Sequence, residues 1–238
     1  MEFFIKVITQ VWDVPIRLFH WLLVVAVVAA YVTATLGGNL MDWHGRIGSF
    51  ILGLLVFRVC WGFLGTTHAR FASFFPSVSR LRAYFKGRWQ GVGHNPLGAL
   101  SVFALLADLV ALVGSGLFAS DDIAYAGPFF ILLNEDSIKD RVSGLHEQSF
   151  NVLLLLLALH LASIVYYRCI KKTNLITPML TGNKVVPKSL ATTVTGGSVF
   201  RLWIAVFISG GVVWLVWNVT LMIMPVSSPV APITVPSF

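Results

Sequence analysis

Four histidines in this sequence lie within or beside long apolar stretches, where an ionisable side chain is costly to place and usually has a function. His146 and His160 are fourteen residues apart. On a helix that turns about 100° per residue, both side chains leave from nearly the same face, about 21 Å apart along the axis. His20 and His44 each lie near one end of a separate stretch. The pattern predicts two binding sites at two depths, one for each pair.

Haem iron is the centre that best explains histidines paired in this way. Two neutral imidazoles, one on each side of the iron, give a six-coordinate centre that carries electrons and leaves no position open for oxygen. Matching the depths pairs His20 with His160 and His44 with His146, so we predict two b-type haems (protohaem IX) with bis-histidine ligation. A zinc site would gather three or four ligands in one cluster. Covalent c-type attachment is disfavoured because the sequence has no CxxCH motif.

Two arginines are suited to hold the negatively charged propionates of such haems. Arg17 lies three residues before His20 on the same helix face, and Arg46 lies two residues after His44. Either side chain could form charge-assisted hydrogen bonds with a propionate. Either could instead extend its charged end to the membrane surface. We predict both as cofactor-binding residues and leave this alternative open.

Three further polar residues have no place in the two pairs. His68 is expected to be solvated. His94 precedes Asn95 and Pro96, which suit the cap and the first turn of a helix, so an entry loop is expected there, with a contact to a haem propionate or a quinone as the alternative. Asp108 lies in the middle of an apolar stretch, where a carboxylate should be paired or protonated. A hydrogen bond within the bundle is favoured for it over a role in proton uptake.

The elements that position these residues are predicted to be transmembrane helices. Hydrophobic residues make up 57% and charged residues 11% of the 238 residues, and the mean hydropathy is +0.82. Soluble domains carry about 25% charged residues. A net charge of +7 must therefore be judged by the positive-inside rule before nucleic acid is considered. Five stretches are long enough to cross a bilayer, roughly 14–36, 43–64, 96–119, 145–167 and 200–224.

Charge is unevenly distributed over the connecting segments. The segments 65–95 and 168–199 hold most of the lysines and arginines, and the opposite segments hold most of the acids. The positive-inside rule then places the N-terminus in the cytoplasm and the C-terminus in the periplasm. On the periplasmic side, Asp121 and Asp122 could steer a basic partner. The last fourteen residues, 225–238, contain four prolines and no charge and are expected to form an extended arm.

These motifs together resemble the bacterial cytochrome b561 family, which includes the b-type cytochrome subunit of nickel–iron hydrogenases. The resemblance covers about residues 10–183. It rests on five segments of the sequence: Trp12–Trp21 (WDVPIRLFHW), His44–Gly48 (HGRIG), Leu145–Glu147 (LHE), Leu159–His160 and Pro178–Gly182 (PMLTG).

The resemblance implies a four-helix bundle with two bis-histidine haems, and it carries the ligand roles onto His20, His44, His146 and His160. It also implies electron exchange between the quinone pool and a periplasmic redox partner. The chain departs from the family by a fifth span without histidine and a proline-rich tail. We therefore expect an all-α membrane protein, with a four-helix dihaem domain over residues 1–198 and an additional transmembrane helix with its tail over residues 199–238.

The sequence thus favours a multi-pass cytochrome b of the bacterial inner membrane, alone or in a homo- or hetero-oligomer. It would exchange electrons between quinone and a periplasmic c-type cytochrome or a dehydrogenase or hydrogenase subunit. Two alternatives stay open. A stand-alone superoxide:quinone oxidoreductase would work without a protein partner, and a histidine-dependent proton or metal transporter would bind no haem. Against the transporter, the sequence shows neither an internal repeat nor a pair of broken helices.

Overall fold

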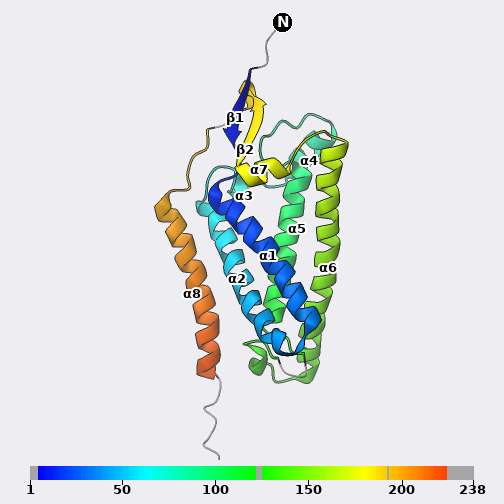
Figure 1. Ribbon diagram of the computed structural model, residues 1–238, viewed down its shortest axis with the longest axis vertical. Coiled ribbons are helices and arrows are strands. Elements are labelled where there is room, and N and C mark those ends of the chain that lie inside the picture. Colours follow the sequence, from blue (N-terminus) through cyan, green and yellow to red (C-terminus); the bar gives the residue numbers. More distant parts are fainter. Residues whose placement is uncertain (1–4, 122–124, 192, 224–238) are drawn as a thin grey trace, which may run out of the picture.

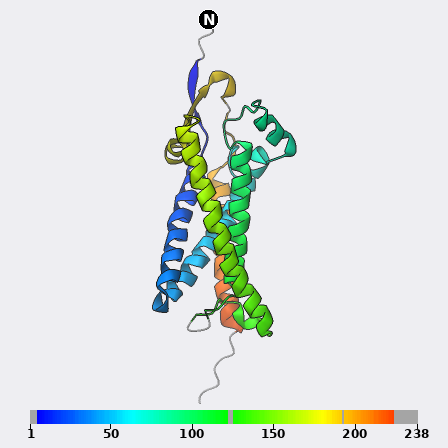
Figure 2. The same ribbon diagram turned by 90° about the vertical axis from the view of Figure 1, so that its right-hand side faces the viewer.

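The computed structural model describes residues 5–121, 125–191 and 193–223. Within these ranges five helices are long and apolar enough to cross a membrane, which confirms the five predicted spans. Figures 1 and 2 show that the long helices run alongside one another and that α8 stands at one side of the others, against α2. The bounds are α1 Val14–Leu36, α2 Met41–Leu64, α5 Pro96–Gly116, α6 Asp136–Cys169 and α8 Val199–Ile223.

The two ends of the bundle differ in charge, and we name them accordingly. At the basic end, α1, α5 and α8 begin and α2 and α6 end, so that the connections there are the segments 65–95 and 170–198. At the acidic end, α1 and α5 end and α2 and α6 begin. The proposed cytoplasmic side corresponds to the basic end.

The helix α6 is longer than the apolar stretch predicted for it. It begins at Asp136, nine residues before the expected start at 145, and contains 34 residues. At a rise of 1.5 Å per residue it is about 51 Å long, whereas the hydrocarbon core is about 30 Å thick. Hydropathy detects only the part that lipid surrounds, so the polar first turns, which extend the helix at the acidic end, were missed.

Capping residues explain where two of the long helices begin. The Asp13 carboxylate accepts a hydrogen bond from the backbone N–H of Ile16, and Pro15 occupies the first turn of α1. Asn95 accepts in the same way from Gly98 at the start of α5, as the sequence predicts. The caps fix where α1 and α5 begin, and the cap of α1 thereby sets the depth of His20.

The prediction of an all-α fold is wrong at the basic end, where two short strands pair. Strand β1 (Lys6–Gln10) runs antiparallel to β2 (Asn183–Pro187), with Val7 opposite Val186. The backbone of Gly182 also accepts hydrogen bonds from Val11 and Trp12. The pairing ties the N-terminus to the segment after α6. The remaining short elements are η1 Gly38–Leu40, α3 Phe71–Phe74, α4 Val78–Phe85, η2 Phe130–Leu132, α7 Ile176–Thr181 and η3 Lys188–Leu190.

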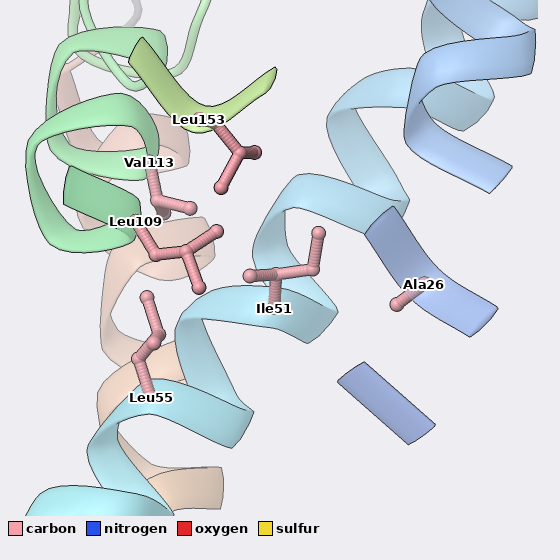
Figure 3. Close-up of a cluster of buried hydrophobic side chains, with 6 residues drawn as sticks. All are labelled: Ala26, Ile51, Leu55, Leu109, Val113 and Leu153. Carbon is pink, nitrogen blue, oxygen red and sulfur yellow. The ribbon is translucent and has the colours of Figure 1, made fainter. Parts of the chain in front are cut away.

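A layer of apolar side chains crosses the bundle between the two histidine levels (Figure 3). On α6, Leu153 lies seven residues from both His146 and His160. It is 2% exposed. The close-up shows side chains from α1, α2, α5 and α6 converging on this layer. It separates the two levels by a closely packed apolar region, and its buried members are Ala26, Ile51, Leu55, Leu109, Val113 and Leu153.

The fifth long helix, α8, packs along α2. Ala205 is fully buried, and a Cβ atom at Gly53 of α2 would lie 3.2 Å from the Val213 side chain. The segment that leads into α8 is fastened to the end of α2 by a bridge between Thr66 and Gly196. The helix therefore covers one side of α2, where its small residues Ala205 and Ser209 are buried.

Candidate functional site

His44 and His146 meet at the acidic end of the bundle. His44 comes from the first turn of α2 and His146 from α6. Their ring centroids are 6.1 Å apart, and the ring planes are nearly perpendicular at 89°. His44 Nδ1 lies 2.9 Å from the carbonyl oxygen of Ala30, and His146 Nδ1 lies 2.8 Å from that of Leu112. Each ring is thus held by one of its two nitrogens.

These contacts indicate the tautomer of both rings. A carbonyl oxygen only accepts hydrogen bonds, so Nδ1 of each ring carries the hydrogen and Nε2 keeps a free lone pair. Histidines that ligate metals are typically oriented by such a bond from the second nitrogen. Two imidazole–metal bonds of about 2 Å each and two ring radii separate the centroids by about 6 Å. The observed separation therefore suits a metal held between His44 and His146.

His20 and His160 lie on the other side of the apolar layer, toward the basic end. The two rings are close enough to interact electrostatically. His20 packs edge-on against Trp21 at 4.9 Å between centroids. Its Nδ1 is buried and has no hydrogen-bond partner within the described ranges. A buried polar atom without a partner is destabilising, so this position lacks a contact that a bound group could supply.

The structure gives Arg17 a partner in the chain itself. Its Nη1 donates to the carbonyl oxygen of Leu180 in α7, and Trp21 Nε1 donates to that of Met179 at 3.4 Å. The neighbouring Gly182 has φ of 85°, and a Cβ there would lie 3.3 Å from Arg17 Nε. Arg17 thus fastens α7 to the start of α1. Its Nε is buried and unpaired in the described chain, so one donor is left for an anion.

Arg46 points away from His44. Residues two apart on a helix are separated by about 200° around the axis. The guanidinium of Arg46 lies over the Trp43 ring at 5.3 Å, and the side chain lines a shallow depression with Val213 and Trp217 of α8. The structure therefore shows Arg46 beside α8, without a contact to the histidine pair, and its predicted role at a propionate stays a prediction.

The structure describes two of the three acidic residues singled out from the sequence, Asp108 and Asp121. Asp108 Oδ2, in the middle of α5, is buried, and the described part of the chain offers it no hydrogen bond. The predicted hydrogen bond within the bundle is therefore not found at this oxygen. Asp121 accepts a hydrogen bond from the backbone of Tyr125 at 2.8 Å. Asp122 lies outside the described residues.

Tyr125, which sequence reasoning missed, lies over the His44 end of α2. A Cβ atom at Gly45 would come within 2.0 Å of the Tyr125 hydroxyl, so the phenol packs directly on the backbone next to His44. Burial raises the pKa of Tyr125, and the nearby Asp42 charge raises it further. In the sequence, Gly45 directly after His44 was the signal that another part of the chain packs closely against the helix here.

His94 lies in the loop that leads into α5, as the sequence predicts, but its ring is enclosed at the basic end. Its ring lies 4.5 Å from that of Trp12 and 4.6 Å from that of Phe74, and its Nδ1 is buried without a partner in the described chain. Burial lowers the pKa of His94 to about 3, helped by the charges of Arg58 and His68. The expectation of a solvated His68 is wrong, because its side chain is half-buried and burial lowers its pKa.

Acid is expected to destabilise the protein through His94. In the unfolded chain this histidine takes up a proton near pH 6.5, but in the folded chain only near pH 3. Protonation therefore favours the unfolded chain as pH falls from 6.5 toward 3. His94→Phe should remove this part of the pH dependence. Thermal unfolding of both proteins in detergent between pH 7 and pH 4 measures the difference. If the unfolding temperatures of the two proteins fall equally as the pH is lowered, His94 does not contribute to the destabilisation by acid.

Asp13 is the second residue that sequence reasoning missed. Its carboxylate is 6% exposed and caps α1 through Ile16 N at 2.8 Å. It also accepts hydrogen bonds from Trp61 Nε1 at 2.9 Å and Thr66 Oγ1 at 2.7 Å, both at the end of α2. The buried Arg58 attracts it. Asp13 thus joins the start of α1 to the end of α2. It lies beside Thr66, which is bridged to Gly196 in the segment that leads into α8.

Comparison with known proteins supports a relationship to one family. A profile of the prokaryotic cytochrome b561 family matches residues 11–182. A probable Ni/Fe-hydrogenase B-type cytochrome subunit of Azotobacter vinelandii is 29% identical over 168 residues, which cover 56% of this chain and 65% of that protein. A protein of the same description from Azotobacter chroococcum mcd 1 is 30% identical over 143 residues, which cover 46% of this chain and 59% of that protein.

The chain therefore spans less than two thirds of the length of these curated relatives. No solved structure matches it. The matched residues 11–182 include both histidine pairs and end before α8 begins at Val199.

Proposed function

Because the chain belongs to the prokaryotic cytochrome b561 family, we propose that it is a dihaem cytochrome b that transfers electrons between membrane quinone and a periplasmic redox partner. Family membership, the named relatives and the five apolar helices make it a multi-pass bacterial membrane protein that binds haem b and takes part in membrane electron transfer. The proposal adds the number of haems, their ligands, the quinone and the partner.

The geometry of His44 and His146 is the observation that carries the proposal. Both rings donate through Nδ1 to a backbone carbonyl, which leaves Nε2 for iron. Their centroid separation of 6.1 Å suits ligation from both sides. This pair would hold the outer haem.

The inner haem would lie between His20 and His160. His160 is close enough for its charge to act on His20, and among the described residues His20 Nδ1 has no hydrogen-bond partner. The unpaired Nε of Arg17, one helical turn from His20, could donate to a propionate. Arg17 is therefore the better of the two predicted propionate partners, because Arg46 is directed toward α8.

Haem b supplies reversible one-electron chemistry at its iron when it is bound. The residues of the chain position and insulate it. The carbonyls of Ala30 and Leu112 orient His44 and His146. The apolar layer around Leu153 keeps water out of the space between the two levels. Water exclusion and ligand orientation are the means by which a protein adjusts a haem potential.

The proposal is tested by a reduced-minus-oxidised spectrum of the detergent-purified protein and a pyridine haemochrome assay. Two low-spin protohaems per chain are expected. A protein that binds no haem under conditions that load other b-type cytochromes would refute the proposal and favour the transporter. Reduction by superoxide with no protein partner would favour the stand-alone oxidoreductase. Salt-sensitive reduction by a basic c-type cytochrome would favour a partnered subunit.

Gly116 allows a sharp test of the outer pair. A Cβ atom at Gly116 would lie 2.9 Å from Cε1 and 3.1 Å from Nδ1 of His146, so Gly116→Ala must displace the ring from the Leu112 carbonyl. We expect weaker binding of the outer haem, with a penalty of about 1–3 kcal/mol from overpacking. Gly114→Ala is the matched control, because a Cβ there meets nothing within 4 Å. Equal haem content in both variants would argue against ligation by His146.

The orientation and the division of the chain complete the proposal. The basic end would face the cytoplasm and the acidic end the periplasm of a bacterial inner membrane. Residues 1–198 would form the haem domain, and residues 199–238 would add α8 and a tail, of which 224–238 lie outside the described residues. The relatives are described as hydrogenase subunits, and a hydrogenase or another periplasmic dehydrogenase is the kind of partner that we propose for the outer haem.

A further inference from the structure

A short helical segment projects sideways from the basic end of the bundle. In Figure 2, α4 stands out from the upper end, beyond α5. The segment that precedes it is fixed in depth by one aromatic ring of α5. Phe71, Phe74 and Phe75 all contact Phe103, with centroids 5.4, 5.6 and 5.8 Å apart. Phe103 lies two turns inside the start of α5 at Pro96. The segment therefore lies beside the first two turns of α5, at the end of its apolar span.

The position of α4 is set by specific contacts. Its Tyr84 hydroxyl lies 2.5 Å from the hydroxyl of Tyr167 on α6. Arg80 donates to the carbonyl oxygens of Ser73 and Phe75 and so fixes the turn between α3 and α4. One face of α4 is thus held toward the bundle, and the other face is held outward.

The outward face combines apolar and basic side chains. Val78, Arg82 and Phe85 are separated by four and three residues and share one side of the helix. Val78 is 64% and Phe85 72% exposed, and Phe75 next to the helix is 58% exposed. Lys86 follows directly and is also exposed. We call Val78, Arg82, Phe85 and Lys86 the α4 face.

Charge around the α4 face is of one sign. The sequence contains no aspartate or glutamate from residue 43 to residue 107, while Arg82, Lys86 and Arg88 follow one another within seven residues. None of these three side chains forms an ion pair with another described residue. Among the described residues their charges therefore have no acidic partner, and they lie at the basic end of the bundle.

We propose that the α4 face binds anionic phospholipid head groups of the leaflet at the basic end. Val78 and Phe85 lie in the boundary of the acyl chains, and Arg82 and Lys86 extend to the phosphates. Lysine and arginine near an anionic membrane surface each strengthen binding by about fivefold. The inference goes beyond electron transfer and does not depend on the number of haems or on their ligands.

A lipid titration of the detergent-purified protein tests the inference. Phosphatidylglycerol and phosphatidylcholine with the same acyl chains are added, and bound lipids are counted by native mass spectrometry. The wild type should prefer phosphatidylglycerol. Arg82→Gln combined with Lys86→Gln should weaken phosphatidylglycerol binding by about fivefold for each charge removed and leave phosphatidylcholine unchanged. Both side chains are exposed, so the variant should fold normally.

Arg201→Gln is the matched control, since Arg201 is an exposed arginine at the basic end, in the first turn of α8. It should keep the preference for phosphatidylglycerol. A wild type without lipid preference would overturn the inference. So would a preference that survives in the double variant, or one that is lost in Arg201→Gln. Phe85→Ser should weaken the binding of both lipids. Unchanged binding would show that the apolar side chain of Phe85 does not contact the acyl chains.

Discussion

Replacing His44 by alanine is expected to leave the protein with one haem per chain instead of two. His44 and His146 would bind the same iron, so loss of one imidazole removes an axial ligand from the outer haem only. The inner pair, His20 and His160, lies beyond the apolar layer and should keep its haem. A pyridine haemochrome assay gives the stoichiometry, and the reduced spectrum shows which component is lost. His20→Ala should give the complementary result.

Two controls separate ligation from general damage. His68→Ala removes a histidine outside both pairs and should retain two haems. His44→Gly leaves a space for added imidazole, which should restore the low-spin spectrum if the side chain acts only as a ligand. Loss of both haems from His44→Ala alone would mean that the two sites are not independent. Retention of both would exclude His44 as a ligand.

The long helices could be predicted from the sequence because each is a continuous apolar run of membrane length. The start of α5 was also predictable, since Asn95 and Pro96 are a local signal. The first nine residues of α6, most of them polar, gave no such signal, because hydropathy does not detect a helix that continues into water. The β1–β2 pair was missed for a different reason: Val7 and Val186 are far apart in the sequence, and neither strand is long enough to be recognised alone.

The approach of His44 to His146 could be predicted because depth along a helix follows directly from residue number, and their roles as ligands stay a prediction. The structure brings the rings of His44 and His146 together at 6.1 Å, which that depth argument anticipates. The surroundings of the site could not be predicted in the same way. Tyr125 reaches Gly45 through the fold of a loop, and Arg46 turns toward a helix that the family profile does not cover. Such contacts depend on tertiary packing.

Replacing Asp13 by alanine is expected to destabilise the protein by about 3–5 kcal/mol, because one buried carboxylate both caps a helix and accepts hydrogen bonds from two further side chains. The substitution removes the cap of α1 and leaves Trp61 Nε1 and Thr66 Oγ1 without an acceptor. It also leaves the buried Arg58 without its nearby counter-charge. Thermal or denaturant unfolding in detergent measures the loss. Thr66→Val, which removes a single hydrogen bond, should lose only about 1 kcal/mol.

The control for this prediction is Asp136→Ala in the first turn of α6. Its side chain is 92% exposed and pairs only with Lys139 at 2.8 Å, so its removal should leave the unfolding transition unchanged. Asp13→Asn adds a further distinction, because asparagine can still cap α1 but carries no charge. A loss close to that of alanine would assign most of the effect to Asp13 Oδ2, which carries charge near Arg58 and accepts from Trp61 and Thr66, because the amide nitrogen of asparagine cannot accept these hydrogen bonds. A loss close to zero would assign it to the cap of α1, which asparagine can keep and which fixes the depth at which His20 is held.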